Sequence, residues 1–296
     1  MLAALIAFVV FSPQLVSLLF ARDGYGDWFR IQSEPKACII NVWHVVEFKP
    51  YMGSIGGWLE KIADKYRKRV NGIHFNVISV SIEDAEVMLK RGLEPDVISF
   101  SYGFINDRQA DEYLYELDDS FSSRNDISVT AGSFDGRLYA LPLCASGYVL
   151  IYQPGADTEF SKEELIESAG SVEEFKKGKA LSCICDMRVA GDIYRAGLTG
   201  GAVQFDAEPY SLNAAEDREV QFIGIWKGIE EYKLKYAAEF ILRATNKPAQ
   251  DDLCGLGLMP TILNAEAEFG QQWIKKVYLT FDIFSIKNCF SGNGGS

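Results

Sequence analysis

The stretch that decides the fold runs from Ile39 to Arg69 and reads IINVWHVVEFKPYMGSIGGWLEKIADKYRKR. Its first part is apolar and rich in β-branched residues, which predicts a strand. Its last part predicts an amphipathic helix, because Trp58, Ile62, Tyr66 and Val70 recur every four residues. A glycine-containing loop separates the two, and in open α/β sheets ligands bind at this edge.

The alternation of strand and helix continues beyond this unit. GIHFNVISVS at 72–81 predicts a second strand, IEDAEVMLKRG at 82–92 a helix, and PDVISFS at 95–101 a third strand. This β-α-β-α-β order predicts parallel strands with right-handed crossovers. GRLYALPLCASGYVLIYQ at 136–153 predicts two strands that Pro142 and the small residues 145–147 separate, as where a chain passes between domains.

Later segments extend the α/β pattern. Helical patterns cover 161–180, 188–198 and 230–246, and the first of these begins with Ser161 and Glu164 in the spacing of a capping box. Strand patterns cover 180–187 and 218–226.

Length, composition and charge narrow the possible classes of protein. The 296 residues suffice for two domains, and 48% hydrophobic and 13% aromatic residues can build a sizeable core. A formal net charge of −12 argues against a nucleic-acid partner, because phosphate binding needs clustered Lys and Arg. The basic run Tyr66–Arg69 ends a predicted helix, where cations favour the helix dipole.

The first twenty residues contain no charged side chain. We interpret residues 1–21 as an export signal or a membrane anchor, and 22–35 as a linker. The alternative is a buried core helix, which Pro13 would kink. The expected location is therefore outside the bacterial cytoplasmic membrane or in the periplasm, with anchoring by residues 1–20 left open.

The six cysteines are scattered, so no disulfide framework is required. Cys38 and Cys144 lie in apolar runs and are interpreted as buried small hydrophobes. Cys183 and Cys185 share one face of a predicted strand, but no further ligands lie nearby in the sequence. With only two histidines in the chain, we expect neither a metal site nor a cofactor.

Seven segments in order resemble the extracellular solute-binding proteins of ABC importers, the group that includes sugar binders. They lie within residues 36–275 and read INVWH, GGWLEKIADKY, VMLKRGLEPDVISFSYGF, GRLYALPLCASGYVLIYQ, FKKGKALSCICDMR, IGIWKGIEEYKLKYAAEFILRA and GLGLMPT. The resemblance implies an α/β, two-lobed, type II periplasmic-binding-protein-like fold.

The resemblance also implies domain boundaries and one departure. Lobe 1 is expected at 36–141 and 218–247, and lobe 2 at 142–217 and 248–290. The family usually has a long helical stretch after the strand that ends at Tyr152, and here about twenty residues precede VEEFKKGKA. We therefore expect a truncated second lobe.

Residues at predicted strand ends are candidates to bind a solute between the lobes. Trp43 is either a stacking platform or a core aromatic. His44 should point to the opposite face of its strand, where it either forms a hydrogen bond to a ligand in the cleft or is a satisfied surface histidine. Glu47 could accept hydrogen bonds from sugar hydroxyls. Ser54 is a candidate helix N-cap that could also contact a ligand.

The remaining candidates lie at later strand ends. Ser101 and Tyr102 end the third strand, and Ser146 and Tyr148 lie beside the crossover, where packing competes with ligand contact. Arg188 could meet an anionic or polyol ligand, or form an ion pair with a nearby aspartate.

No sequence motif favours an enzyme. The chain lacks a nucleophile elbow, a phosphate-binding loop and a zinc-binding HExxH helix, and GLGLM at 255–259 lacks the third glycine of a dinucleotide loop. The resemblance implies a solute-binding component that works with the membrane subunits of an ABC importer and binds a small solute, and the expected solute is a carbohydrate. The alternative is a degenerate surface or sensory protein that keeps the fold and binds a protein partner or no small ligand.

Overall fold

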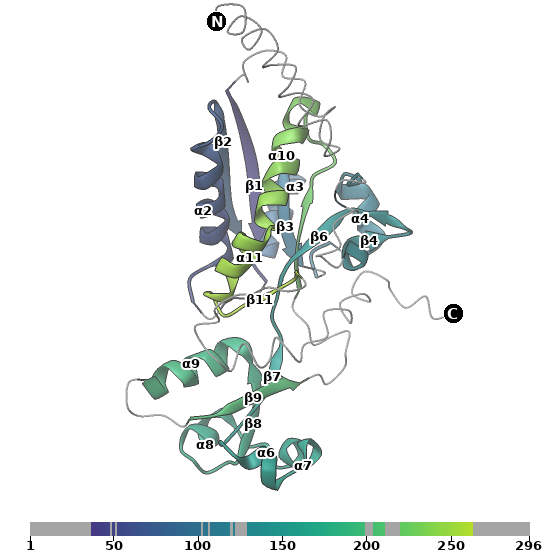
Figure 1. Cartoon of the computed structure of the whole chain (residues 1–296). Coiled ribbons are helices and arrows are strands. Elements are labelled where there is room, and N and C mark those ends of the chain that lie inside the picture. The colour runs from purple at the N-terminus through teal and green to yellow at the C-terminus, as the bar shows by residue number, and fades with distance from the viewer. Residues whose placement is uncertain are drawn as a thin grey trace, which may run out of the picture.

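The computed structural model describes residues 37–47, 49–50, 52–101, 103–105, 107–118, 121, 129–198, 204–210 and 220–262. These residues form two lobes, a larger one with a mixed sheet and a smaller one with a short sheet, which β6 and β7 connect (Figure 1). The predicted segments 1–21, 22–35 and 263–290 lie outside the described residues. Within the described part of the chain, no helix has the length and apolarity needed to cross a bilayer.

The larger lobe is built on a six-stranded sheet in the order β11-β6-β10-β3-β1-β2. β1 pairs in parallel with β2 and β3, as the β-α-β-α-β pattern predicted. β10 is antiparallel to both β3 and β6, so the sheet is mixed. The strands are β1 (Cys38–Val45), β2 (Ile73–Val80), β3 (Val97–Ser101), β6 (Ala140–Ala145), β10 (Val220–Ile225) and β11 (Met259–Pro260).

The two faces of this sheet carry separate sets of helices. Side chains of α2, α10 and α11 pack on one face around Tyr66, Phe75 and Phe240, whose rings are in contact. The other face packs against α3 and α4 around Phe100 and Phe222. The helices are α2 (Ile55–Arg67), α3 (Ile82–Lys90), α4 (Asp107–Tyr113), α10 (Glu231–Ala244) and α11 (Lys247–Cys254).

A short hairpin connects α4 to β6. It comprises η1 (Val129–Gly132), β4 (Ser133–Phe134) and β5 (Arg137–Leu138). Gly132 lies directly against β6, since a Cβ atom there would be 1.7 Å from the carbonyl oxygen of Ala140. The backbone N–H of Tyr139 donates to the Gly132 carbonyl at 3.0 Å, which anchors this close approach.

The smaller lobe contains a three-stranded antiparallel sheet in the order β8-β7-β9. Two of its helices begin with a capping box, the expected one at Ser161 and Glu164 and a second at Ser171 and Glu174. Its strands are β7 (Tyr148–Tyr152), β8 (Ser182–Asp186) and β9 (Asp206–Tyr210), and its helices are α6 (Ala156–Glu159), α7 (Lys162–Glu167), α8 (Val172–Lys176) and α9 (Met187–Leu198).

Two expectations about the passage between the lobes differ from the structure. Pro142 does not separate two strands, because it lies inside β6 opposite Phe222, where a register shift in β10 accommodates it. The chain crosses at Ser146 and Gly147, so lobe 2 starts after β6 and not at 142.

The segment 248–262 also lies in the larger lobe, whereas the sequence was interpreted as placing 248–290 in lobe 2. The physical reason is a set of non-local hydrogen bonds. Gln250 Nε2 donates to the carbonyl oxygen of Leu143 at 2.8 Å, and its Oε1 accepts from the Thr261 N–H at 2.8 Å. Met259 of β11 pairs with Ala145 of β6.

Candidate functional site

The end of the larger sheet that leads into the smaller lobe carries a row of polar side chains under α2, in which all members except Ser79 are buried. His44 lies opposite Ser79 on one side and Ser99 on the other, and Gln221 follows in the next strand. Gly56 of α2 covers this row closely, since a Cβ there would be 2.1 Å from Ser79 Oγ. We call His44, Ser79, Ser99 and Gln221 the polar row.

Hydrogen bonds within the polar row define the state of the imidazole. Gln221 Nε2 donates to the carbonyl oxygen of Val45 at 3.2 Å and to Ser99 Oγ at 2.9 Å. Ser99 Oγ lies 3.3 Å from His44 Nδ1 and can donate to it, which places the ring proton on Nε2. Burial lowers the pKa of His44 to about 4, so the imidazole is neutral at pH 7.

Trp43 and His44 point to opposite faces of β1, as expected, but neither presents a free surface to a ligand. Trp43 is buried in the core on the α3 and α4 face, with Phe100 and Phe222. The interpretation as a stacking platform is therefore wrong, because the neighbouring strands and helices cover the indole. His44 bonds within the sheet, so the expected hydrogen bond to a ligand is replaced by one to Ser99.

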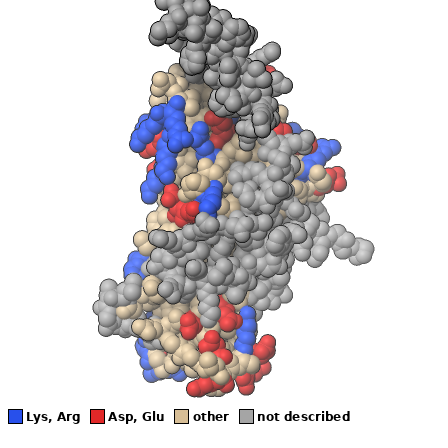
Figure 2. All heavy atoms as spheres, in the orientation of Figure 1, with Lys and Arg blue, Asp and Glu red and all other residues tan. Residues whose placement is uncertain are grey.

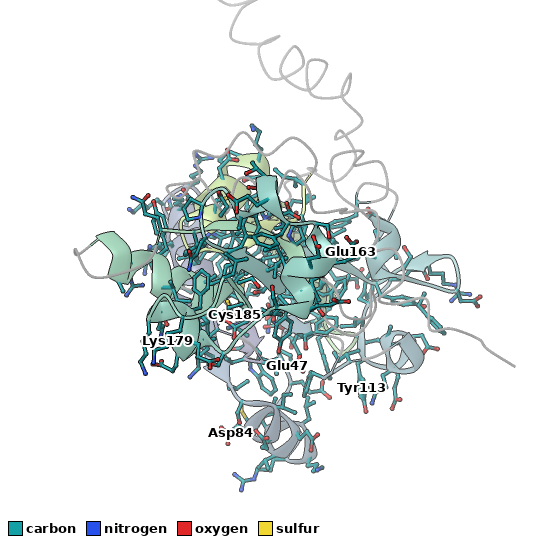
Figure 3. The ribbon with its side chains drawn as sticks, turned by 90° about the horizontal axis from the view of Figure 1, so that it is seen from below. Glu47, Asp84, Tyr113, Glu163, Lys179 and Cys185 are labelled. Carbon is teal, nitrogen blue, oxygen red and sulfur yellow. The ribbon has the colours of Figure 1, made fainter. Side chains whose placement is uncertain are left out.

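The loops that follow β1 and β3 meet at this end of the sheet. A Cβ atom on Gly103 would lie 2.2 Å from Glu47 Oε1, so only a glycine allows the carboxylate to sit there. Burial of the carboxylate raises the pKa of Glu47, while a backbone hydrogen bond from Ser101 opposes the rise. Figure 3, viewed from the smaller lobe, labels Glu47 together with Asp84 of α3. Glu47 is thus an exposed residue whose acid group rests against the backbone.

Two serines at this end have different roles. Ser54 is confirmed as the N-cap of α2, because its side chain accepts from the Gly57 N–H at 3.0 Å. Ser101 is buried, and its hydroxyl has no hydrogen-bond partner among the described residues. An unpartnered buried hydroxyl is uncommon and is a candidate to bind water or a ligand.

The smaller lobe contributes the facing edge. Tyr148 begins β7 directly after the crossover and lies in register between Asp186 of β8 and Tyr210 of β9. Its ring is 43% exposed. Asp186 Oδ1 accepts from the Val189 N–H at 2.8 Å and so caps the start of α9. Sequence reasoning missed Tyr210, because the sequence DAEPY of β9 was not predicted to be a strand.

Three other candidates complete the comparison with the sequence. Arg188 is exposed in the first turn of α9, and the structure gives it no ion pair with Asp186 or Asp192 within the described part. Ser146 is buried at the crossover, which favours packing over ligand contact. Tyr102 lies outside the described residues.

A separate hollow of about 540 Å³ lies at the opposite end of the larger sheet. The ends of α3 and α4 and the residues after β10 line it, and Tyr113 stacks on Trp226 there with ring centroids 5.3 Å apart. None of the solute-binding residues predicted from the sequence lines this hollow. Its lining is Leu89, Lys90, Glu94, Glu112, Tyr113, Trp226, Lys227 and Gly228.

The distribution of surface charge and of possible metal ligands does not identify another binding site among the described residues. Figure 2 shows acidic side chains gathered at the tip of the smaller lobe, where α6 and α7 contribute Asp157, Glu159, Glu163 and Glu164. Basic side chains gather over α2, where Lys65 and Arg67 form ion pairs with acidic neighbours. In the ranges that the structure covers, no three His, Cys, Asp or Glu side chains come together to hold a metal ion.

The fold is similar to that of several solved structures. The sugar-binding protein MalE from Xanthomonas citri superposes with a TM-score of 0.62 at 11% identity, over 81% of this chain and 84% of that chain. Maltodextrin-binding protein MalE1 from L. casei BL23 gives 0.60 at 12% identity, over 88% and 95%. UgpB from Mycobacterium tuberculosis, in complex with glycerophosphocholine, gives 0.58 at 16% identity, over 81% and 85%.

No protein-family model matches the sequence, and no curated protein matches it by sequence. The similarity is therefore one of fold. The two-lobed α/β fold that the sequence predicted is confirmed, and the neighbours that share it are substrate-binding proteins of the kind the resemblance indicated.

Proposed function

We propose that this protein is the extracytoplasmic solute-binding component of an ABC importer and that it binds a sugar or oligosaccharide between its two lobes. The observation that carries the proposal is the meeting of two polar strand edges at the crossover, within a fold shared with sugar-binding proteins. The membrane subunits of the importer are the proposed protein partners.

The larger lobe would supply fixed polar groups. Helix α2 starts at this edge with its N-terminal N–H groups, and such groups bind anions and hydroxyl oxygens. Glu47 offers a partly buried carboxylate next to Gly103, and Ser101 offers a hydroxyl that lacks a partner among the described residues. A carboxylate, a hydroxyl and free N–H groups together can both donate to and accept from a polyol.

The smaller lobe would supply the apolar platform and a cation. Tyr148 is exposed and is adjacent to the partly buried Tyr210 across β7 and β9. Exposed aromatic surface suits the C–H faces of sugars. Arg188 is exposed in the turn that follows Asp186, where it can donate to ligand oxygens. Closure of the lobes on a solute would then select the closed state.

The first test is thermal unfolding of the full chain with maltose, maltotriose, maltotetraose and glycerophosphocholine. A ligand that binds only the native state raises Tm in a saturable way. Saturable stabilisation by a sugar supports the proposal. Stabilisation by glycerophosphocholine alone would retain solute binding and reject the sugar. No stabilisation by any of them favours the alternative, a surface or sensory protein without a small ligand.

A matched pair of variants tests the location of the site. Tyr148 and Tyr115 are both 43% exposed, but Tyr115 lies at the far end of the larger sheet, where its N–H donates to Ile225. We expect Tyr148→Ala to lower the affinity for the stabilising sugar about tenfold, which corresponds to ~1.4 kcal/mol of binding free energy. Tyr115→Ala should leave that affinity unchanged. Equal effects of the two variants in calorimetric titration would reject the proposed site.

A further inference from the structure

The polar row is closed at one end and has unpartnered atoms near the other. At the closed end, Gly56 of α2 packs so tightly that a Cβ atom there would lie 2.1 Å from Ser79 Oγ and 3.6 Å from His44 Cδ2. This contact leaves no room for a ligand beside Ser79. At the other end, Gln221 of β10 and Ser101 of β3 each carry a buried polar atom that has no hydrogen-bond partner among the described residues.

Gln221 and Ser101 face one another across two neighbouring strands. They are directly paired in the antiparallel register of β10 and β3, so their side chains lie on one face of the sheet with Cβ atoms about 5 Å apart. Gln221 is 0% exposed and Ser101 is 7% exposed. No hydrogen bond joins Ser101 Oγ directly to Gln221 Oε1. A third group that bonds to both oxygen atoms would therefore satisfy both.

The neighbours of Gln221 fix the orientation of its side-chain amide. Its Nε2 donates to the backbone carbonyl oxygen of Val45 at 3.2 Å and to Ser99 Oγ at 2.9 Å. A carbonyl oxygen can only accept, so the amide nitrogen must face Val45 and the amide cannot be turned over. The amide oxygen is thereby held where no protein donor reaches it, which costs free energy. A buried acceptor held in this way is a candidate to receive a proton donor from outside the chain.

The chemistry of the two oxygen atoms selects a neutral hydroxyl group. Gln221 Oε1 can only accept, whereas the Ser101 hydroxyl can donate or accept, so one hydroxyl can give its proton to the amide and accept from the serine. A carboxylate or phosphate oxygen has no proton to give. The His44 imidazole is neutral at pH 7, since burial lowers its pKa to about 4, and so adds no positive charge. The Glu47 carboxylate, which accepts from the Ser101 N–H, would also repel an anion.

We propose that Gln221 and Ser101 together bind one hydroxyl group of the solute, and that Gln221 selects this group as a proton donor. The inference rests on the proposed binding of a solute between the lobes, and it adds Gln221 to the candidates predicted from the sequence. Because both oxygen atoms are buried, the site suits a single small group and not a sugar ring. The solute therefore reaches the pair with one hydroxyl, while its ring stays nearer the crossover.

The test couples one hydroxyl of the solute to the two side chains. Maltotriose and its monodeoxy analogues, each of which lacks one hydroxyl, are titrated into the full chain by calorimetry. We expect one analogue to bind the wild type about tenfold more weakly than maltotriose does. Ser101→Ala and Gln221→Met should bind maltotriose about tenfold more weakly and should no longer distinguish it from that analogue, because the same interaction is already lost. The control is Ser182→Ala, which removes a buried hydroxyl of the smaller lobe that donates to the Leu165 carbonyl oxygen, and it should keep the wild-type preference.

The outcomes separate this inference from the proposed function. If wild type and Ser101→Ala bind maltotriose equally, or if Ser101→Ala keeps the preference over every analogue, this inference is overturned and solute binding stands. If only glycerophosphocholine binds the wild type, sugar binding fails, and the inference stands only if Ser101→Ala weakens that solute. If neither solute binds, both proposals fail. Ser101→Ala removes a single unpartnered oxygen atom, so this arm decides the question even where Gln221→Met does not fold.

Discussion

The buried imidazole of His44 predicts a specific dependence of stability on pH. Its folded-state pKa of about 4 lies below the ordinary histidine pKa of 6.5, because burial disfavours the charged form. Between these two values the unfolded chain binds more protons than the folded one, so stability rises with pH. The contribution is complete above about pH 6.5 and is lost as the pH falls towards about 4.

The magnitude follows from the same two pKa values. Each tenfold change in proton affinity corresponds to ~1.4 kcal/mol, so the shift from 6.5 to about 4 corresponds to about 3 kcal/mol. Solvent screening reduces this free-energy contribution only slightly, because the His44 ring is buried in the polar row. Its Nδ1 faces donors from Ser99 and Gln221. A proton on Nδ1 would have to displace the Ser99 hydroxyl proton.

The assay is urea unfolding at a series of pH values between 4 and 7 for wild type, His44→Asn and His74→Asn. An asparagine at position 44 retains an acceptor near the place of Nδ1 and removes the titrating imidazole. Between pH 7 and pH 4 the variant should therefore lose about 3 kcal/mol less unfolding free energy than the wild type. His74, the only other histidine, is exposed on β2, and its replacement should leave the wild-type profile unchanged. The raised pKa of Glu47 acts with the opposite sign, but all three chains share it.

Two results would refute the reasoning about His44. One is an identical pH slope for wild type and His44→Asn. The other, which does not depend on the variant folding, is an NMR titration of the wild-type imidazole in which His44 protonates near pH 6.5.

Four further substitutions test how the fold is held together. Lys233→Met should cost about 3 kcal/mol, because it strands the Asp96 carboxylate of a 3.1 Å ion pair whose side chains are 14% and 8% exposed. Lys65→Met, in a 3.0 Å pair with side chains 68% and 57% exposed, should cost under ~1 kcal/mol in the same urea assay; equal losses would contradict the role of burial. Gly132→Ala should lower Tm and cost ~2–3 kcal/mol, since its Cβ would overlap a β6 carbonyl, and an unchanged Tm would show that η1 shifts freely. Ser54→Ala should cost about 1 kcal/mol through loss of the N-cap, whereas an unchanged unfolding free energy would mean that water replaces the cap.

Much of the local structure could be predicted from the sequence because the signals are periodic and short-range. The four-residue spacing from Trp58 to Tyr66 marked the buried face of α2, and the serine before it marked the N-cap. The same reasoning placed Ser161 in a capping box and β1, β2 and β3 in parallel. Each of these features depends on residues within a few positions of each other or on the alternation of neighbouring elements.

The candidate site was less predictable, because exposure depends on what packs on a residue from elsewhere in the chain. Trp43 and Tyr148 both lie at the ends of strands, yet the first is in the core and the second is 43% exposed. The polar partners of His44 come from residues 55 and 177 positions away. No local pattern encodes such separations.

The sequence by itself determined the identity and order of most helices and strands, since hydrophobic period and capping residues act locally. Only the tertiary structure decided that β10 enters the larger sheet antiparallel to its neighbours β3 and β6 and that residues 248–262 stay with that lobe. Those choices depend on the hydrogen bonds of Gln250 and on strand pairing between distant segments. Their free energy is gained only when distant parts of the chain are brought together.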